Sequence, residues 1–181
     1  MPERTRLLIL AAFNKLVQKK SFDKITIDDI CKEAAVGRST FYRYFSDKYD
    51  ILDYSLRETF RQIDGDSFRT FEDLFLHIGE AALSYWRPLA NLYDTTAIDT
   101  LHASYVKCSE AVSTDFIVRL RGNQPFTPEE TVQMRVLCSG CSHLFEDYVK
   151  GKITIEPDRL AAAVYALVPE VFKGSPEQDA E

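Results

Sequence analysis

The stretch from Thr26 to Leu52 constrains the fold more than any other part of the chain, because it predicts three short helices joined by tight turns. Thr26 is a favourable N-cap residue, and an apolar stripe with helical spacing follows it. That stripe consists of Ile27, Ile30, Cys31 and Ala34. After a turn at residues 34–37, a second helix is expected over residues 38–45. Ser46 and Asp47 then predict the cap of a third helix.

The helix expected over residues 38–45 has two different faces. Phe41 and Phe45 lie one helical turn apart, which predicts that they pack inward against Val36 and the preceding helix. The other side carries arginines and hydroxyls, which suit phosphates and the edges of bases. Its residues are Arg38, Ser39, Thr40, Tyr42 and Arg43. Two helices joined by a tight turn, the second with such a face, predict a helix-turn-helix that reads DNA.

Over roughly residues 4–56 the chain resembles the N-terminal DNA-binding domain of TetR-family transcriptional regulators. The resemblance is carried by Thr26, Ile30, Ala34, Val36, the run Thr40-Phe41-Tyr42-Arg43-Tyr44-Phe45, and Lys48. It implies that Arg38, Ser39, Thr40 and Arg43 face the DNA groove. It also implies that Tyr42 and Lys48 hold phosphates, with Thr26 helping at the start of its helix.

One position departs from the family pattern. Ala35 stands in the turn where these proteins usually have glycine. If the backbone there has a positive φ, alanine costs about 1 kcal/mol. This changes the detail of the turn, and the expected fold stays the same.

The charge of the chain is unevenly distributed. The formal net charge is −6, which by itself disfavours a nucleic-acid partner. Residues 1–50, however, hold ten Lys or Arg against seven Asp or Glu, whereas the remainder holds twelve against twenty-one. A mildly basic N-terminal part on an acidic body is consistent with a local DNA-binding module.

The rest of the chain also shows helical periodicity, so the expected fold class is all-α. Besides the helices at the DNA reader, we expect helices over residues 3–19, 47–63, 70–86, 89–93, 96–120, 127–150 and 157–171. The helix over 96–120 is expected to break or bend near residues 109–113. Neither a strand nor an internal repeat is indicated. We divide the chain into a DNA-binding head (residues 1–46) and an effector-binding and dimerising body (residues 47–181).

The last two expected helices are richly apolar for surface elements. A helix-turn-helix reader usually works as two copies about one DNA turn apart. In TetR-family proteins the last two helices form a four-helix interface with the partner subunit, so the resemblance implies a homodimer here. The alternative is that these two helices only close the core of the monomer.

A C-x-x-C pair, Cys138 and Cys141, has the one spacing in the chain that suits catalysis or a metal. No second ligand pair stands near it, and Cys31 and Cys108 are isolated. Packing is therefore the favoured role of the pair, with redox sensing and metal binding as the alternatives. The three histidines, His77, His102 and His143, show no ligand spacing. No catalytic motif is found, so neither an enzyme nor a cofactor or metal is expected.

The middle helices are rich in aromatic residues, which are mostly core residues in proteins. A small-molecule pocket between the helices is the more specific hypothesis, since the interior of a helical bundle is a common place for ligands. In TetR-family regulators an effector binds there and changes the spacing of the two heads. Tyr85, Trp86, His102 and Tyr105 are the candidates for its polar lining.

Taken together, the sequence predicts a cytoplasmic homodimer that binds a pseudo-palindromic DNA operator and represses transcription, with possible control by an unknown small molecule. The apolar run at residues 7–13 continues as one face of an amphipathic helix, which argues against a secretory signal. No run approaches the length of a membrane span. The alternative function is a dimeric interaction module whose helix-turn-helix no longer binds DNA.

Overall fold

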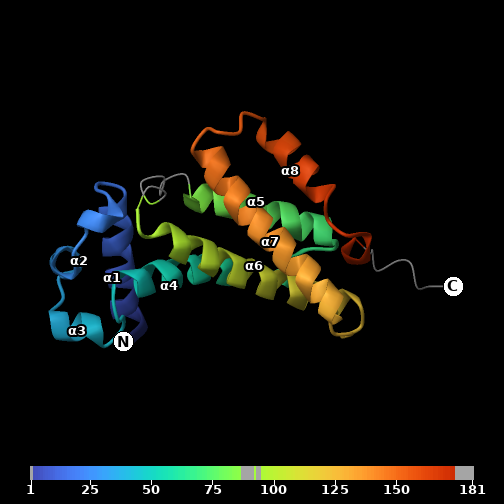
Figure 1. The fold of residues 1–181 in the computed structure, drawn as a ribbon. Coiled ribbons are helices and arrows are strands. Elements are labelled where there is room, and N and C mark those ends of the chain that lie inside the picture. Colours follow the sequence, from blue (N-terminus) through green and yellow to red (C-terminus); the bar gives the residue numbers. More distant parts are fainter. Residues whose placement is uncertain (1, 87–91, 93–94, 174–181) are drawn as a thin grey trace.

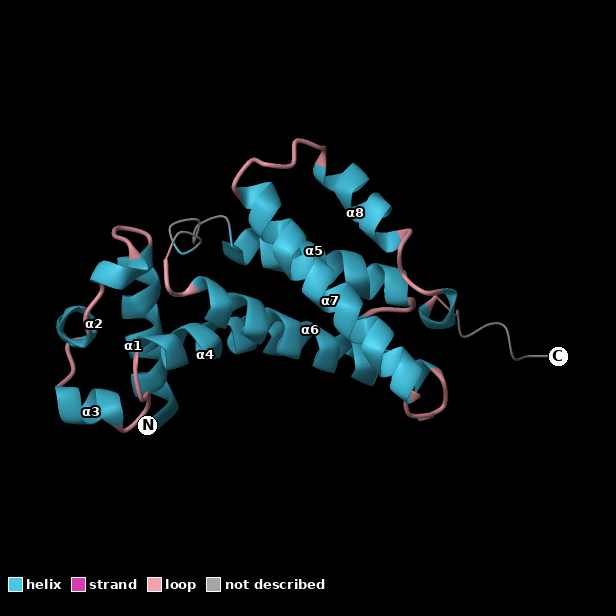
Figure 2. Cartoon of the chain, viewed as in Figure 1, coloured by secondary structure: helices cyan, strands magenta, loops and turns pink. Residues whose placement is uncertain are grey.

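The structure is a computed structural model that describes residues 2–86, 92 and 95–173, and these residues form helices and loops without any strand (Figures 1 and 2). The helices are α1 (Pro2–Val17), α2 (Ile27–Ala34), α3 (Arg38–Tyr42), α4 (Lys48–Arg61), α5 (Phe71–Trp86), α6 (Ile98–Leu120), α7 (Pro128–Val149) and α8 (Pro157–Tyr165). Short 3-10 turns at Phe22–Lys24, Gly65–Ser67 and Glu170–Phe172 join them or follow them. The expected all-α fold is confirmed.

The helices are arranged as a small cluster at one end of a longer bundle (Figure 1). Helices α1, α2 and α3 make the cluster, and α4 runs from it into the bundle, where it packs along α6. Helix α7 lies against α6, and α5 contacts α6, α7 and α8. Because α4 packs on both α1 and α6, it connects the head to the body.

Side-chain caps begin several of these helices where the sequence predicts them. Thr26 and Asp29 form a complete capping box on α2, in which each side chain accepts a hydrogen bond from the other residue's backbone N–H. Thr127 and Glu130 do the same on α7, and Pro128 occupies its first turn. The Asp47 side chain accepts from the N–H groups of residues 49 and 50 at the start of α4. These caps satisfy N–H groups that the helix itself leaves without partners.

Two expectations about helix continuity are wrong. Helix α6 runs without interruption from Ile98 to Leu120, so it does not break near residues 109–113. Helix α8 ends at Tyr165 and does not reach residue 171. Pro169 lacks the N–H that would bond the Tyr165 carbonyl, and it disfavours helical backbone at Val168. The short helix expected over 89–93 lies, apart from Leu92, outside the described residues.

A hydrogen-bonded junction joins the head to the start of α6. One carboxylate oxygen of Asp23 accepts from the Thr96 hydroxyl at 2.7 Å and from the Thr96 backbone N–H at 3.3 Å. The Tyr49 hydroxyl lies 2.6 Å from the same Thr96 hydroxyl. Phe22, next to Asp23, packs its ring edge-on against Tyr49. The loop after α1, the first turn of α4 and the segment before α6 are therefore held together.

Among the residues that the structure describes, no helix combines the length and the apolar character that crossing a membrane requires.

Candidate nucleic-acid interface

The turn between α2 and α3 has a positive φ at Ala35, the geometry in which an alanine is strained. Ala35 adopts a left-handed conformation with φ 54° and ψ 42°, so the strain expected for a non-glycine residue is present. The N–H groups of Ala35 and Val36 bond carbonyls of α2. Gly37 then returns to extended backbone and begins α3. This sharp turn sets the angle between the two helices.

Two phenylalanines anchor α3 on the rest of the head. Phe41 is fully buried and Phe45 nearly so, and their ring centroids lie 6.2 Å apart. Phe45 also packs edge-on against Tyr54 of α4. The inward face of α3 is thus the predicted one, which leaves its other face to solvent.

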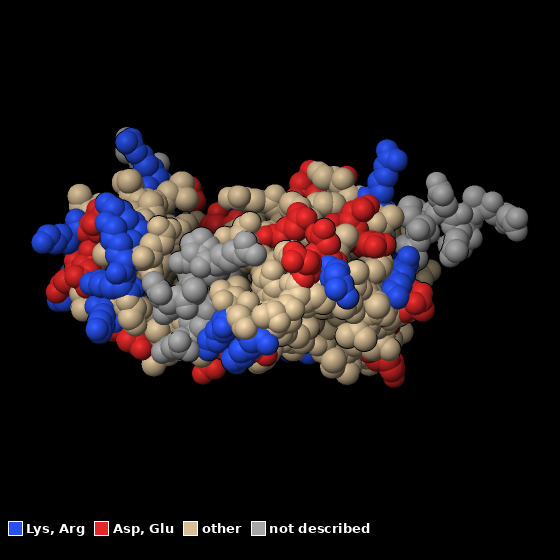
Figure 3. Space-filling view, turned by 90° about the horizontal axis from the view of Figure 1, so that it is seen from above, with Lys and Arg blue, Asp and Glu red and all other residues tan. Residues whose placement is uncertain are grey.

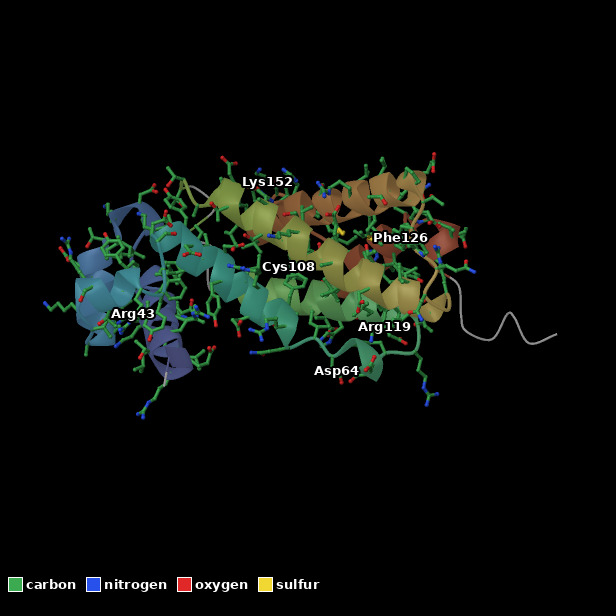
Figure 4. All side chains as sticks on the ribbon, turned by 90° about the horizontal axis from the view of Figure 1, so that it is seen from below. Arg43, Asp64, Cys108, Arg119, Phe126 and Lys152 are labelled. Atoms are coloured by element: carbon green, nitrogen blue, oxygen red, sulfur yellow. The ribbon has the colours of Figure 1, made fainter. Side chains whose placement is uncertain are left out.

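Of the predicted groove-facing residues, Arg38, Ser39 and Arg43 are exposed, whereas Thr40 is half-buried. Tyr42, predicted to hold a phosphate, is exposed too. Arg43 lies at the head end of the molecule, far from Arg119 and Phe126 at the opposite end (Figure 4). Figure 3 shows several Lys and Arg side chains gathered over the head, whereas a group of Asp and Glu occupies the body on that face. The exposed side chains of α3 and Arg43 thus offer hydrogen-bond donors and two guanidinium groups at the head end of the molecule.

Arg38 makes a paired contact inside this surface. Its Nε and Nη2 atoms donate to the two carboxylate oxygens of Asp28 at 2.6 and 2.8 Å. The hydrogen bonds and charge of Asp28 raise the pKa of Arg38 above its ordinary value. Asp28 belongs to α2, so the contact crosses from one helix of the pair to the other.

Thr26 and Lys48, the two remaining predicted DNA contacts, have other partners in the free protein. The Thr26 hydroxyl donates to the Asp29 carboxylate at 2.7 Å within the capping box. The Lys48 amine donates to the carbonyl oxygens of Phe22, Ile25 and Asp23 at 2.9, 3.2 and 3.4 Å, and lies 4.4 Å from the centre of the Phe22 ring. Lys48 thus ties the start of α4 to the loop after α1, a contact that no local pattern indicates.

The body contains a cavity of about 310 Å³ between α5, α7 and α8. Its wall is largely apolar, with Phe75, Leu83, Phe145 and Leu160 among the lining residues. Of the predicted effector-binding residues, Tyr105 lines the cavity, whereas His102 is not among the lining residues. The side chains of Tyr85 and Trp86 lie outside the described ones. Burial raises the pKa of Tyr105 well above its ordinary value, so its phenol is neutral at physiological pH.

His102 instead bridges α6 and α7, through an arrangement that the sequence does not reveal. One of its ring nitrogens lies 2.6 Å from the Ser142 hydroxyl and the other 2.9 Å from a Glu146 carboxylate oxygen. The three side chains resemble a nucleophile, a base and an acid. Ser142 is fully buried, however, and sits within a helix whose backbone N–H groups are already bonded, so neither substrate access nor an oxyanion hole is provided. The contacts serve to hold the two helices together.

The four cysteines are free and buried. Burial raises the pKa of Cys138 to about 11 and of Cys141 to about 12. Both thiols therefore stay protonated at neutral pH, where a thiol is a poor nucleophile. Among the described residues, no group of three or more His, Cys, Asp or Glu is placed to hold a metal ion. The packing role predicted for Cys138 and Cys141 agrees with this burial.

The head is similar to a known family of DNA-binding domains. Residues 9–54 match the model for bacterial regulatory proteins of the tetR family. The chain is 30% identical over 63 residues to the dhaKLM operon transcriptional activator DhaS of Lactococcus lactis, which covers 35% of this chain and 34% of DhaS. It is 24% identical to the regulator YuxN of Bacillus subtilis over 99% of this chain and 66% of YuxN. The matched stretches thus span less than two thirds of both relatives.

Solved structures show the same fold over nearly the whole chain. NalD, the secondary repressor of the MexAB-OprM multidrug efflux pump in Pseudomonas aeruginosa, superposes with a TM-score of 0.62 and 19% identity, covering 96% of this chain and 98% of NalD. The regulator FadR from Bacillus subtilis, in complex with stearoyl-CoA, gives a TM-score of 0.58 and 16% identity, covering 90% of this chain and 97% of FadR. The match over residues 9–54, the whole-chain relative and the shared fold agree: the chain is similar to TetR-family transcriptional regulators, and its head resembles their helix-turn-helix DNA-binding domain.

Proposed function

We propose that the protein binds a pseudo-palindromic operator as a homodimer and represses transcription of the adjacent gene. The observation that carries this proposal is the exposed face of α3, where Arg38, Ser39, Tyr42 and Arg43 surround the buried anchor Phe41. A helix presented in this way fits the major groove. Occupancy of an operator that overlaps a promoter excludes RNA polymerase, which is how binding becomes repression.

The homodimer is supported by an exposed apolar surface at the end of the chain. Val132 and Val136, one turn apart on α7, are 62% and 67% exposed, and Leu167, just after α8, is 74% exposed. Large apolar residues at such exposure, on α7 and just after α8, suit an interface between subunits. A second copy of the same surface would cover them and would bring two heads to two half-sites.

Selection from random duplex DNA by the purified full-length protein tests the operator proposal. We expect enrichment of an inverted repeat whose half-site centres lie about one DNA turn apart, as two identical heads require. The affinity for the enriched duplex should fall steeply with salt, because phosphate contacts release counterions. A reporter gene with this duplex in its promoter should be expressed less when the protein is present.

The same measurements distinguish operator binding from the main alternative function, a protein-interaction module. If the helix-turn-helix surface binds another protein and not DNA, the folded dimer enriches no sequence and shows little affinity for duplex DNA at any salt concentration. Enrichment of a single, unrepeated site would contradict the dimeric arrangement while keeping the DNA-binding role.

We further propose that the cavity between α5, α7 and α8 binds a small molecule with an apolar body and a neutral or positively charged head. Three exposed carboxylates, Glu72, Glu80 and Asp158, belong to its lining, and none of the described lining residues is Lys, Arg or His. The phosphates of a ligand such as the stearoyl-CoA bound to FadR would here face like charges. An apolar ligand without negative charge suits this cavity better.

Two amphiphiles with the same tail test this ligand class. In calorimetric titrations below their micelle concentrations, decyltrimethylammonium should bind at least about tenfold more tightly than decyl sulfate, because three carboxylates attract one head and repel the other. Ala161→Trp, which fills the cavity, should abolish the binding. Ala111→Trp, on the exposed side of α6, is the matched control. Equal affinity for the two heads would contradict the proposal.

A further inference from the structure

The paired contact between Arg38 and Asp28 has a geometry that bears on how the protein recognises DNA bases. Arg38 is the first residue of α3 and Asp28 the second of α2, and the two side chains remain 63% and 67% exposed. An ion pair this exposed contributes little to stability, because water screens it. Its effect lies in the position that it gives the guanidinium group.

Asp28 occupies one edge of the Arg38 guanidinium group, and the adjacent edge can form a second bidentate contact. A guanidinium carries five N–H donors in one plane. Asp28 takes the Nε donor and one donor of Nη2. The Nη1 atom and the second donor of Nη2 remain on the adjacent edge. Those two nitrogens have the spacing that pairs with O6 and N7 of guanine in the major groove.

We propose that Asp28 is a positioning residue for DNA specificity: it holds Arg38 so that the free edge of the guanidinium reads one guanine in each half-site. This inference rests on the proposed operator binding. A carboxylate at a DNA-binding surface repels phosphates, so it lowers the affinity for all sequences alike. Its benefit is therefore discrimination between bases, since an arginine fixed in advance loses less conformational freedom on meeting the matching base.

Base preference measured position by position is the readout that a merely structural role would not change. The wild-type protein should select guanine strongly at one position of each half-site. Asp28→Ala should lower the preference for guanine there by roughly tenfold, the discrimination expected of one bidentate contact. Affinity for unrelated duplex DNA should stay the same or rise slightly, because a repulsive charge is lost. Asp28→Asn keeps one acceptor oxygen and should fall between the two.

A double-mutant cycle tests whether Asp28 acts through Arg38. Arg38→Ala should remove the same guanine preference, and adding Asp28→Ala to it should change nothing further. A further change would mean that Asp28 contacts a base directly, which would overturn the positioning role. Both side chains are exposed, so thermal melting should show all three variants folded.

Three other outcomes would overturn the inference. If Asp28→Ala leaves the base preference unchanged, the ion pair has no role in reading DNA. If it strengthens binding to every sequence equally, Asp28 masks Arg38 and the contact is autoinhibitory. If the wild-type protein enriches no sequence, the operator proposal fails, and this inference fails with it. The wild-type arm thus tests the proposed function, and the comparison of variants tests Asp28.

Discussion

Phe41→Ala is expected to destabilise the protein by about 3–5 kcal/mol and to abolish operator binding. Phe41 is fully buried, and its ring packs against Phe45 and Tyr42. Truncation removes its apolar contacts and leaves a cavity beneath α3. Because this helix has only five residues and depends on that anchor, the recognition surface loses its shape along with its stability. Urea unfolding and a mobility-shift titration on the selected operator measure the two effects.

Tyr42→Ala is the matched control, since it changes an aromatic residue of the same helix that faces solvent. Tyr42 is 55% exposed, so its removal should change the free energy of unfolding by less than about 1 kcal/mol. Operator affinity should still fall, because the resemblance places Tyr42 on a phosphate. If Phe41→Ala were as stable as the wild type, α3 would not depend on its buried face. Full operator affinity for Tyr42→Ala would remove this residue from the proposed contacts.

The variant Val136→Arg/Leu167→Arg is expected to convert the dimer into a monomer and to lower operator affinity by about 100-fold or more. Both residues are exposed, Val136 on α7 and Leu167 just after α8. In a symmetric interface each arginine would meet the same charge or an apolar surface on the other subunit. A monomer must then bind each half-site separately, which loses the effective concentration of the second head. Light scattering after gel filtration gives the mass, and binding to full and half operators gives the affinity.

Leu8→Arg is the control for the effect of replacing an exposed apolar residue with arginine outside the proposed interface. Leu8 lies on α1 and is 49% exposed, away from α7 and α8. It should leave the mass of the protein unchanged. A dimer that survives the double substitution would place the interface on another surface, and a monomeric wild type would refute the symmetric operator model.

Features that depend only on neighbours along the chain could be predicted from the sequence. The capping boxes at Thr26 and Thr127 need only a partner three residues away, so their helix starts could be predicted. The burial of Phe41 and Phe45 follows from helical periodicity, and the strained turn follows from one alanine at a glycine position. For the same reason the exposed face of α3 could be predicted, because it is the side of the helix opposite the buried residues.

Contacts between residues of different elements depend on how the whole chain packs. Asp28 and Arg38 are ten residues apart, the Lys48 amine reaches carbonyls more than twenty residues earlier, and His102 meets Ser142 forty residues later. Periodicity tells which face of a helix is buried but not which residue of another helix it faces. Tyr105 was predicted among the effector residues, yet its neighbours in the cavity were not, because the cavity depends on the distance that α8 keeps from α5 and α7. That distance is set by packing over the whole bundle, which no local pattern encodes.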